Sequence, residues 1–260
     1  MGDELKVERR GPVLVVTIDR QERMNSLSPE VHEGLLATWT SLHDDQSVRA
    51  IVITGAGDRA FCTGMDLKAA AERGGAQRKV SDDVHEQMRV TPLNCDVWLP
   101  TIVAVNGVCT GAGFHFLADA DVVVAASTAT FLDGHVSVGQ VSAIEPITLL
   151  PRIGLGNALR LAVLGRPGRI DAQDALRISL VDEIVEPEKL LERAVTLAEY
   201  AATGSPAAVE ASKRAIRGAL ERPLGEAMQH GWELLLAHWK HPDSIEGPKA
   251  FAEKREPRWT

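Results

Sequence analysis

One stretch of the chain, residues 99–126, constrains the fold most: LPTIVAVNGVCTGAGFHFLADADVVVAA. Its apolar runs predict buried strands at 101–105 and 122–126, separated by an Asn-Gly turn, a second turn at Gly111-Ala112-Gly113, and a helix. Glycine lets the backbone turn tightly and leaves N–H groups free to face a ligand, and a helix start adds its positive dipole end. The stretch therefore predicts a main-chain anion or oxyanion site, with His115 about one turn from the candidate donor.

Composition narrows the class of protein. The chain has 260 residues, of which 45% are hydrophobic and only 4% aromatic, so the core is expected to consist of Ala, Val, Leu and Ile. Its net charge of −8 argues against nucleic acid as the main partner, because binding phosphates needs a basic face. The bulk numbers therefore favour a globular protein with an ample core and without nucleic acid as its main partner.

Cysteine usage and terminal sequence indicate a cytoplasmic protein. Cys62, Cys95 and Cys109 are odd in number and lack CxxC spacing, so we expect reduced thiols and no metal site. The polar N-terminus is unlike a signal peptide. No run approaches the roughly 20 apolar residues of a membrane span, so no membrane partner is expected.

The order strand–strand–helix recurs along the first 150 residues, whereas helices dominate after Pro151. The length favours a core of residues 1–200 and a smaller C-terminal appendage, residues 201–260. We expect strands at 5–8 and 13–19, which form a hairpin, at 48–54 and, shorter, at 180–185. Helices are expected from Ser28 to 43, from the 60–67 turn to 71, and at 81–98 with a break near Pro92. Residues 73–79 are expected to be a polar segment. A broad apolar face in 223–239 suggests packing against the core or a neighbouring subunit.

A second turn has the same form as the first. Gly64-Met65-Asp66 follows a strand end and leads into a helix, as Gly111-Ala112-Gly113 does. Two such turns facing each other could offer two N–H groups to one oxygen, which is what stabilises an enolate or a tetrahedral oxyanion. The alternative is that these glycine turns merely end strands.

Five segments in the same order resemble the crotonase family, that is, the enoyl-CoA hydratase/isomerase family. Residues 20–27 resemble its RPExxNAL segment, with Gln21 in place of the proline, and residues 60–67 resemble AFxxGxDL. Residues 100–113 resemble PxIAxVxGxxxGxG, residues 164–185 resemble LTGRxxxAxEALxxGLVxxVV, and residues 246–255 resemble EGxxAFxEKR. The resemblance therefore covers nearly the whole chain.

This resemblance implies an α/β fold, a spiral of β-β-α units with a C-terminal helical trimerisation region. It implies an acyl-CoA substrate, with coenzyme A bound as part of the thioester and no permanently bound cofactor. The oxyanion donors map onto Met65 and Ala112. The homotrimer, or a dimer of trimers, is the assembly that the resemblance implies.

The resemblance also implies where coenzyme A binds. The contacts map onto Arg23, Met24, Ser26, Leu27, Ala60, Thr63, Met65, Asp66 and Leu67, with Phe251 and Lys254 reaching the coenzyme A of a neighbouring subunit. From the residues alone, Arg23 and Lys254 could equally be solvated surface charges. Asp66 is more typical of a helix cap than of a catalyst.

The main departure from the family concerns its acid–base pair. Hydratases of this family carry two glutamates where this chain has His115 and His135. Histidine can also exchange protons near neutral pH, although both could be simple hydrogen-bonded pocket residues. Asp133 could orient an imidazole, and Glu145 could act as a base or pair with Arg152.

The sequence thus predicts an enoyl-CoA hydratase, a lyase that adds water to a 2-enoyl-CoA. Three alternatives stay open. The histidines could serve a C–C bond or thioester hydrolase, or Glu145 could be the base of an isomerase. The chain could also bind acyl-CoA without catalysis.

Overall fold

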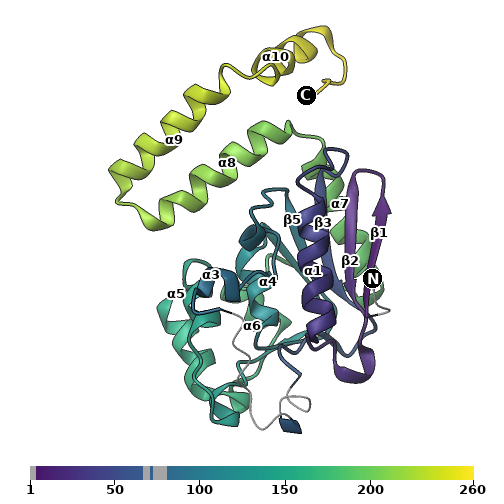
Figure 1. Cartoon of the computed structure of the whole chain (residues 1–260), viewed down its shortest axis with the longest axis vertical. Helices are drawn as coiled ribbons and strands as arrows, with labels where there is room; N and C mark the ends of the chain where they lie inside the picture. Colours follow the sequence, from purple (N-terminus) through teal and green to yellow (C-terminus); the bar gives the residue numbers. More distant parts are fainter. Residues whose placement is uncertain (1–3, 67–70, 73–80) are drawn as a thin grey trace.

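The protein is described by a computed structural model that covers residues 4–66, 71–72 and 81–260 (Figure 1). Its larger sheet has six strands in the order β1-β2-β3-β5-β7-β10, and only the β1–β2 pair is antiparallel. The strands are β1 (Leu5–Arg10), β2 (Val13–Ile18), β3 (Ala50–Gly55), β5 (Thr101–Val105), β7 (Val122–Ala126) and β10 (Glu183–Val185). The predicted hairpin and central strands are confirmed.

A second sheet of four short strands has the order β4-β6-β8-β9. These strands are β4 (Ala60–Cys62), β6 (Val108–Cys109), β8 (Thr130–Phe131) and β9 (Ile170–Asp171). Two successive units, β5-β6-α4 and β7-β8-α5, each give one strand to each sheet and then a helix. The recurring strand–strand–helix order is therefore a real architectural repeat, and it builds two sheets rather than one.

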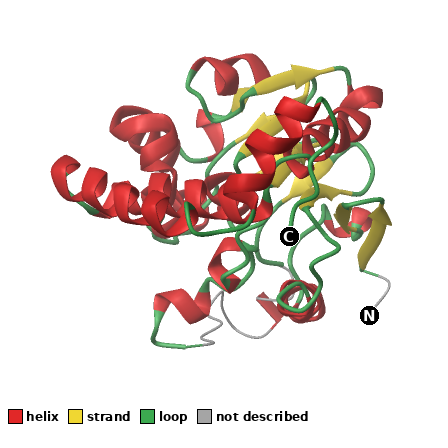
Figure 2. Cartoon of the chain, turned by 90° about the horizontal axis from the view of Figure 1, so that it is seen from above, coloured by secondary structure: helices red, strands yellow, loops and turns green. Residues whose placement is uncertain are grey.

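The larger sheet is covered on both faces, as Figure 2 shows from above. Val13 and Val15 pack toward α7 (Leu190–Ala202), whereas Leu14 and Val16 pack toward α1 (Pro29–Ser41). Strand side chains alternate between faces, so a continuous apolar run is needed where both faces are buried. Helix α1 begins as predicted, because the Ser28 hydroxyl accepts from the Val31 N–H at 3.2 Å.

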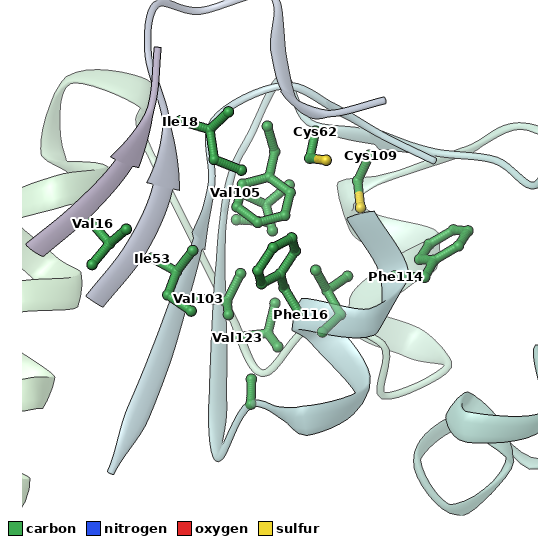
Figure 3. Close-up of a cluster of buried hydrophobic side chains, with 14 of the residues drawn as sticks. Val16, Ile18, Ile53, Cys62, Val103, Val105, Cys109, Phe114, Phe116 and Val123 are labelled. Atoms are coloured by element: carbon green, nitrogen blue, oxygen red, sulfur yellow. The ribbon is translucent and has the colours of Figure 1, made fainter. Parts of the chain in front are cut away.

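Figure 3 shows Phe116 of helix α4 (Gly113–Asp119) in the core beside Val103 and Val123 of the larger sheet, whereas Phe114 lies on the other side of the helix. Phe116 meets Phe61 edge to face, with ring centroids 5.9 Å apart. The helix starts close against β4, because a Cβ at Gly113 would lie 2.6 Å from the Cys62 carbonyl oxygen. Gly113 is thus required for the close approach of α4 to the strand.

The prediction of a helix over residues 81–98 is wrong. The segment holds only α3 (Val84–Gln87) and a 3₁₀ turn at Leu93–Cys95. Tertiary hydrogen bonds fix the rest: the Trp39 indole donates to the Val90 carbonyl at 3.0 Å, and Asn94 Nδ2 donates to Asp119 at 2.9 Å. The predicted helix at 64–71 and the polar segment at 73–79 fall mainly outside the described residues.

The remaining helices confirm the prediction that helices dominate after Pro151. They are α5 (Ile144–Leu164), α6 (Ala172–Arg177), α7, α8 (Pro206–Gly218), α9 (Leu224–His238) and α10 (Asp243–Glu253). In Figure 1, α8, α9 and α10 form an arm beside the sheet-containing body. An ion pair between Lys213 of α8 and Asp121 joins this arm to the sheet-containing body, with the Nζ and Oδ2 atoms 2.6 Å apart.

Helix α5 begins at Ile144, before the predicted helical region after Pro151, and is bent. Pro151 lies within it, and Gly154 has φ +73°, so two helical segments join there. By length and composition alone, α5 is the one helix in the described part of the chain that could cross a membrane. Its Leu149, Ile153, Ala158 and Leu161 pack into the main core.

Candidate active site

Three loops meet because three parallel strands of the second sheet end in register. Cys62 of β4 is opposite Cys109 of β6, and Cys109 is opposite Phe131 of β8. The chain leaves these ends through residues 63–66, 110–112 and 132–135, and all three loops line one pocket of about 590 Å³. Strand register therefore assembles the pocket from segments about 70 residues apart in sequence.

Two residues that line this pocket, Met65 and Ala112, have backbone N–H groups turned away from the anchored carbonyl of the same peptide unit. The Gly64 carbonyl accepts from the Leu27 N–H at 2.7 Å, and the Gly111 carbonyl accepts from the Phe114 N–H at 2.8 Å. In a trans peptide the N–H points opposite to the C=O, so the N–H groups of Met65 and Ala112 face away from these anchors. Neither N–H donates to another backbone group in the turns and loops that the structure describes.

The two turns also touch. Gly64 and Gly111 have φ +77° and +55°, a region that glycine enters without strain. A Cβ at Gly64 would lie 2.9 Å from the Ala112 nitrogen and 3.3 Å from the Gly111 Cα. Hence both turns favour glycine for their conformation, and Gly64 is also required for their close contact.

Arg20 holds the loop of residues 23–27 against the pocket wall. Its Nη1 donates to the Ser26 carbonyl at 2.7 Å, and its Nη2 lies 3.3 Å from the Asp66 carboxylate. Thr63 Oγ1 donates to the Met24 carbonyl at 3.0 Å. Asp66 thus contributes to an ion pair, and the helix that it was predicted to cap lies outside the described residues.

A cluster of four titratable side chains lies at the inner wall. Glu145 Oε1 is 3.4 Å from Nε2 of His115 and 3.6 Å from Nε2 of His135. His135 Nδ1 is 2.7 Å from Asp133 Oδ1. One carboxylate of α5 therefore contacts the imidazoles of both sequence-predicted histidines.

This arrangement corrects one expectation for Glu145. Arg152 does not pair with it, because the Arg152 guanidinium binds Asp182 at 3.0 Å. The Glu145 side chain is only 12% exposed and lines the pocket. Glu145 is therefore available to the pocket and to the histidines.

The pKa values of the cluster move apart. The hydrogen bond to Asp133 raises the pKa of His135 above its usual value, against burial, and the Glu145 charge adds to the rise. Burial disfavours the charged form of Glu145, but the hydrogen bond and charge of His115 outweigh it and lower the pKa. The pair at the pocket wall is thus an ionised carboxylate beside an easily protonated imidazole.

His115 takes a different position from His135. Its side chain is 6% exposed and lies behind Glu145, and it is not among the residues that line the pocket. No hydrogen-bond partner for its Nδ1 exists among the described residues. His115 therefore contacts a residue of the pocket wall, Glu145, without lining the pocket itself.

Comparisons with known proteins decide the family. A family model described as "Enoyl-CoA hydratase/isomerase" matches residues 8–260. The chain belongs to this family. A carnitinyl-CoA dehydratase of Citrobacter koseri is 33% identical over 263 residues, covering 100% of this chain and 99% of that protein.

Solved structures of the family share the fold. An enoyl-CoA hydratase/isomerase from Mycobacterium paratuberculosis superposes with a TM-score of 0.91 at 36% identity, covering 99% of this chain and 98% of that one. An enoyl-CoA hydratase from Bacillus anthracis gives 0.85 at 29% identity, with 99% of each chain covered. The predicted crotonase fold is confirmed, and the chain is an acyl-CoA enzyme of the crotonase type.

The structure gathers some of the residues predicted by family resemblance and separates others. Arg23, Met24, Ser26, Thr63 and Asp66 line the pocket with Met65 and Ala112. Leu27 and Ala60 lie behind this surface, where Leu27 is bridged to Met65 and the Ala60 carbonyl accepts from Asn25 at 2.7 Å. Leu67 is outside the described residues.

Two predicted contacts lie elsewhere in the single chain. Phe251 is 88% exposed on α10, and Lys254 ends this helix in the left-handed conformation at φ +53°. Neither lines the pocket of its own chain. A role for them in coenzyme A binding would therefore need a second copy.

Sequence reasoning missed much of the pocket wall. The additional lining residues are Glu22, Thr110, Gly111, Leu132, Gly134, Val138, Gln140, Val141 and Arg166. Arg166 belongs to a segment that resembles a family motif, and Thr110 and Gly111 lie inside the glycine turn, so these three carried a signal. Val138, Gln140 and Val141 carried none, because the loop between β8 and α5 has no periodic pattern.

The cysteines nearest the pocket are unsuited to nucleophilic chemistry. Burial raises the pKa of Cys62 to about 12, and it also raises that of Cys109. A thiolate is the reactive form of cysteine, so these thiols are unreactive at neutral pH. The described residues contain no group of three side chains arranged to hold a metal ion.

Proposed function

We propose that this chain is an enoyl-CoA hydratase-like lyase that adds water, in the syn sense, across the double bond of a 2-enoyl-CoA. One observation carries the proposal. The Glu145 carboxylate contacts His135 at 3.6 Å on the wall of a pocket that Met65 and Ala112 also line. The dehydratase and hydratase names of the relatives support the same reaction class.

The N–H groups of Met65 and Ala112 form the oxyanion hole of this proposal. They hold the thioester oxygen, where negative charge develops as the enolate forms. Each donor of this kind contributes roughly 2.7–4 kcal/mol to transition-state stabilisation. Their fixed orientation needs no rearrangement during the reaction.

Glu145 and His135 divide the proton transfers. Glu145 takes a proton from water, whose oxygen bonds to the β-carbon, and protonated His135 gives a proton to the α-carbon. The proton then passes from Glu145 to His135, which restores both groups. Groups whose pKa values are pushed apart in this way suit an acid and a base in one site.

Coenzyme A enters as part of the substrate, and the chain holds no permanent cofactor. The proposal places it against the backbone of Met24, Ser26 and Leu27, with its adenine near residues 60–67. Phe251 and Lys254 of a neighbouring copy complete the site in a homotrimer or a dimer of trimers. Residues 201–260 form the oligomerisation region of a cytoplasmic protein.

The test is turnover of crotonyl-CoA, followed by loss of the absorbance of the unsaturated thioester. Glu145→Gln keeps the size of the side chain but removes its charge, so kcat is expected to fall by about 10²- to 10⁴-fold with KM little changed. Glu192→Gln, on the exposed side of α7, is the matched control.

Two outcomes contradict the proposal. If no acyl-CoA raises the thermal unfolding temperature of the protein, the ligand class is wrong. If acyl-CoA binds but a broad acyl panel is not turned over, the chain is a non-catalytic binding member of the family.

A hydrolase is the second candidate, and the 2.7 Å contact between Asp133 and His135 favours it. A histidine backed by a carboxylate can activate water for attack on a carbonyl carbon. Incubation with a cyclic β-diketone separates the two reactions, since C–C cleavage without any requirement for coenzyme A would remove the hydratase proposal. Release of free thiol from an acyl-CoA would instead indicate thioester hydrolysis.

A further inference from the structure

Asp133 is a buried carboxylate that the proton transfers above do not use. Its side chain is 1% exposed, and it lies two residues after the end of β8. Its Oδ1 accepts from both the ring Nδ1 of His135, at 2.7 Å, and the His135 backbone N–H, at 3.0 Å. One oxygen thus fixes both the ring and the backbone of the same histidine.

The other oxygen of Asp133 is attached to a different element. Oδ2 accepts a hydrogen bond from the Ser142 hydroxyl. Ser142 lies two residues before α5 and three before Glu145. A single carboxylate therefore joins the loop that carries His135 to the segment that leads into Glu145.

We propose that Asp133 is a positioning residue that holds His135 and Glu145 in register as an acid–base pair. Because Nδ1 of His135 donates to Asp133, its Nε2 is the atom that faces Glu145, 3.6 Å away. The hydrogen bond from the Ser142 hydroxyl to Asp133 holds the start of α5, which carries Glu145, next to His135. This inference deepens the proposed function and rests on it for its catalytic consequence.

The charged groups around His135 come from several elements. Asp133 lies on its own loop, Glu145 comes from α5, and His115 of α4 faces the same Glu145 oxygen at 3.4 Å. Arg166 lines the same pocket. The hydrogen bond to Asp133 is the largest cause of the raised His135 pKa, so its removal lowers that pKa even though Glu145 remains.

The experiment compares Asp133→Asn, Ser142→Ala and the matched control Asp174→Asn, a half-buried site on α6 outside the pocket lining. The ring resonances of the eight histidines are titrated by NMR, and His135→Gln identifies the signal of His135. The pH dependence of kcat for crotonyl-CoA is measured on the same samples. The titration needs no turnover, so it tests the positioning role even if the proposed reaction is wrong.

Asp133→Asn is expected to lower the His135 pKa and to move the matching limb of the pH–rate profile to lower pH. Its kcat should fall at least roughly tenfold, and up to about 10⁴-fold, the loss known for the buried aspartate of a Ser–His–Asp triad. Ser142→Ala should lower kcat but leave the His135 pKa unchanged. It removes only the hydrogen bond that links Asp133 to the segment before Glu145, and the bond from Asp133 to His135 remains. KM should change little in either variant.

Three results would overturn the inference. If the His135 pKa is unchanged in folded Asp133→Asn, the contact between Asp133 and His135 does not control His135, and the inference loses its basis. Equal losses of kcat in Asp133→Asn and Asp174→Asn would show a general effect of the substitution. If Asp133→Asn does not fold, Ser142→Ala becomes the test of the inference. An unchanged kcat in Ser142→Ala then contradicts the inference.

Discussion

At the residue scale, the two histidines that replace the family glutamates have unequal positions. His135 is 25% exposed at the pocket wall, whereas His115 is 6% exposed behind Glu145. The chain lacks a carboxylate at both family positions, but Glu145, from the start of α5, places one in contact with both histidines. The site therefore keeps one carboxylate beside one titratable partner, although these residues occupy different sequence positions.

The pKa of His135 links this site to stability. The folded pKa lies above the unfolded value of about 6.5, so protonated His135 stabilises the fold most fully below that pH. The contribution is lost as pH rises through the folded pKa. The lowered pKa of Asp133 has the opposite dependence, and its contribution is lost as pH falls below about 4.

His135→Gln should therefore reduce the free energy of unfolding more at pH 5.5 than at pH 9. Urea unfolding of wild type and variant at both pH values, at one protein concentration, measures the difference. His85→Gln, on the exposed side of α3, is the matched control. An equal loss at both pH values would contradict the raised pKa of His135.

At the element scale, the site depends on strand ends more than on helices. The Gly64 and Gly111 carbonyls accept hydrogen bonds from Leu27 and Phe114, and this leaves the next N–H on each turn facing away from these anchors. Glycine turns were visible in the sequence, but their facing arrangement required the β4–β6 register. The same register brings in the β8 loop with Asp133 and His135, which sequence spacing alone could not align with the turns.

Gly64→Ala tests this contact between the turns. The added Cβ would lie 2.9 Å from the Ala112 nitrogen, so one donor must move, and kcat should fall by roughly 10²- to 10³-fold. Gly11→Ala is the matched control, because Gly11 also has positive φ, at +58°, but has nothing within 4 Å of the added Cβ. Both substitutions add left-handed strain of about 1–2 kcal/mol, which thermal unfolding measures.

Only Gly64→Ala is expected to lose turnover. If the two variants unfold at similar temperatures and Gly64→Ala keeps wild-type kcat, the facing turns do not carry the chemistry. A loss of kcat in Gly11→Ala of the same size would assign the effect to strain in general.

At the scale of the whole molecule, the arm of α8, α9 and α10 leaves a large apolar surface uncovered. Leu224, Met228, Trp232, Leu235 and Trp239 are 41–77% exposed on α9 and its end. Of the two partners that the sequence allowed for this face, the core of the same chain does not cover it. An apolar patch of this kind on a water-soluble surface favours a contact with another copy.

Met228→Glu should therefore lower the molar mass measured by light scattering, from that of the proposed trimer or dimer of trimers toward that of the monomer. A charge buried in an apolar interface without a partner opposes association. Gln229→Glu adds the same charge at the next, exposed position of α9 and should leave the mass unchanged. Equal masses for wild type and Met228→Glu would place the contact elsewhere.

The sequence by itself determined the central strands, the Ser28 cap and the two glycine turns, because these depend on local backbone preference and on apolar periodicity, whereas the fold class followed from the family resemblance. The family resemblance located the loop of residues 23–27 and the two histidines. Tertiary structure decided which groups meet. The position of Glu145 between two imidazoles, the bond from Asp133 to Ser142 and the short helix at residues 84–87 all depend on contacts between segments distant in sequence. A side chain's pKa and its partner are set by what packs around it, and neither the strand register nor the start of α5 can be read from local pattern.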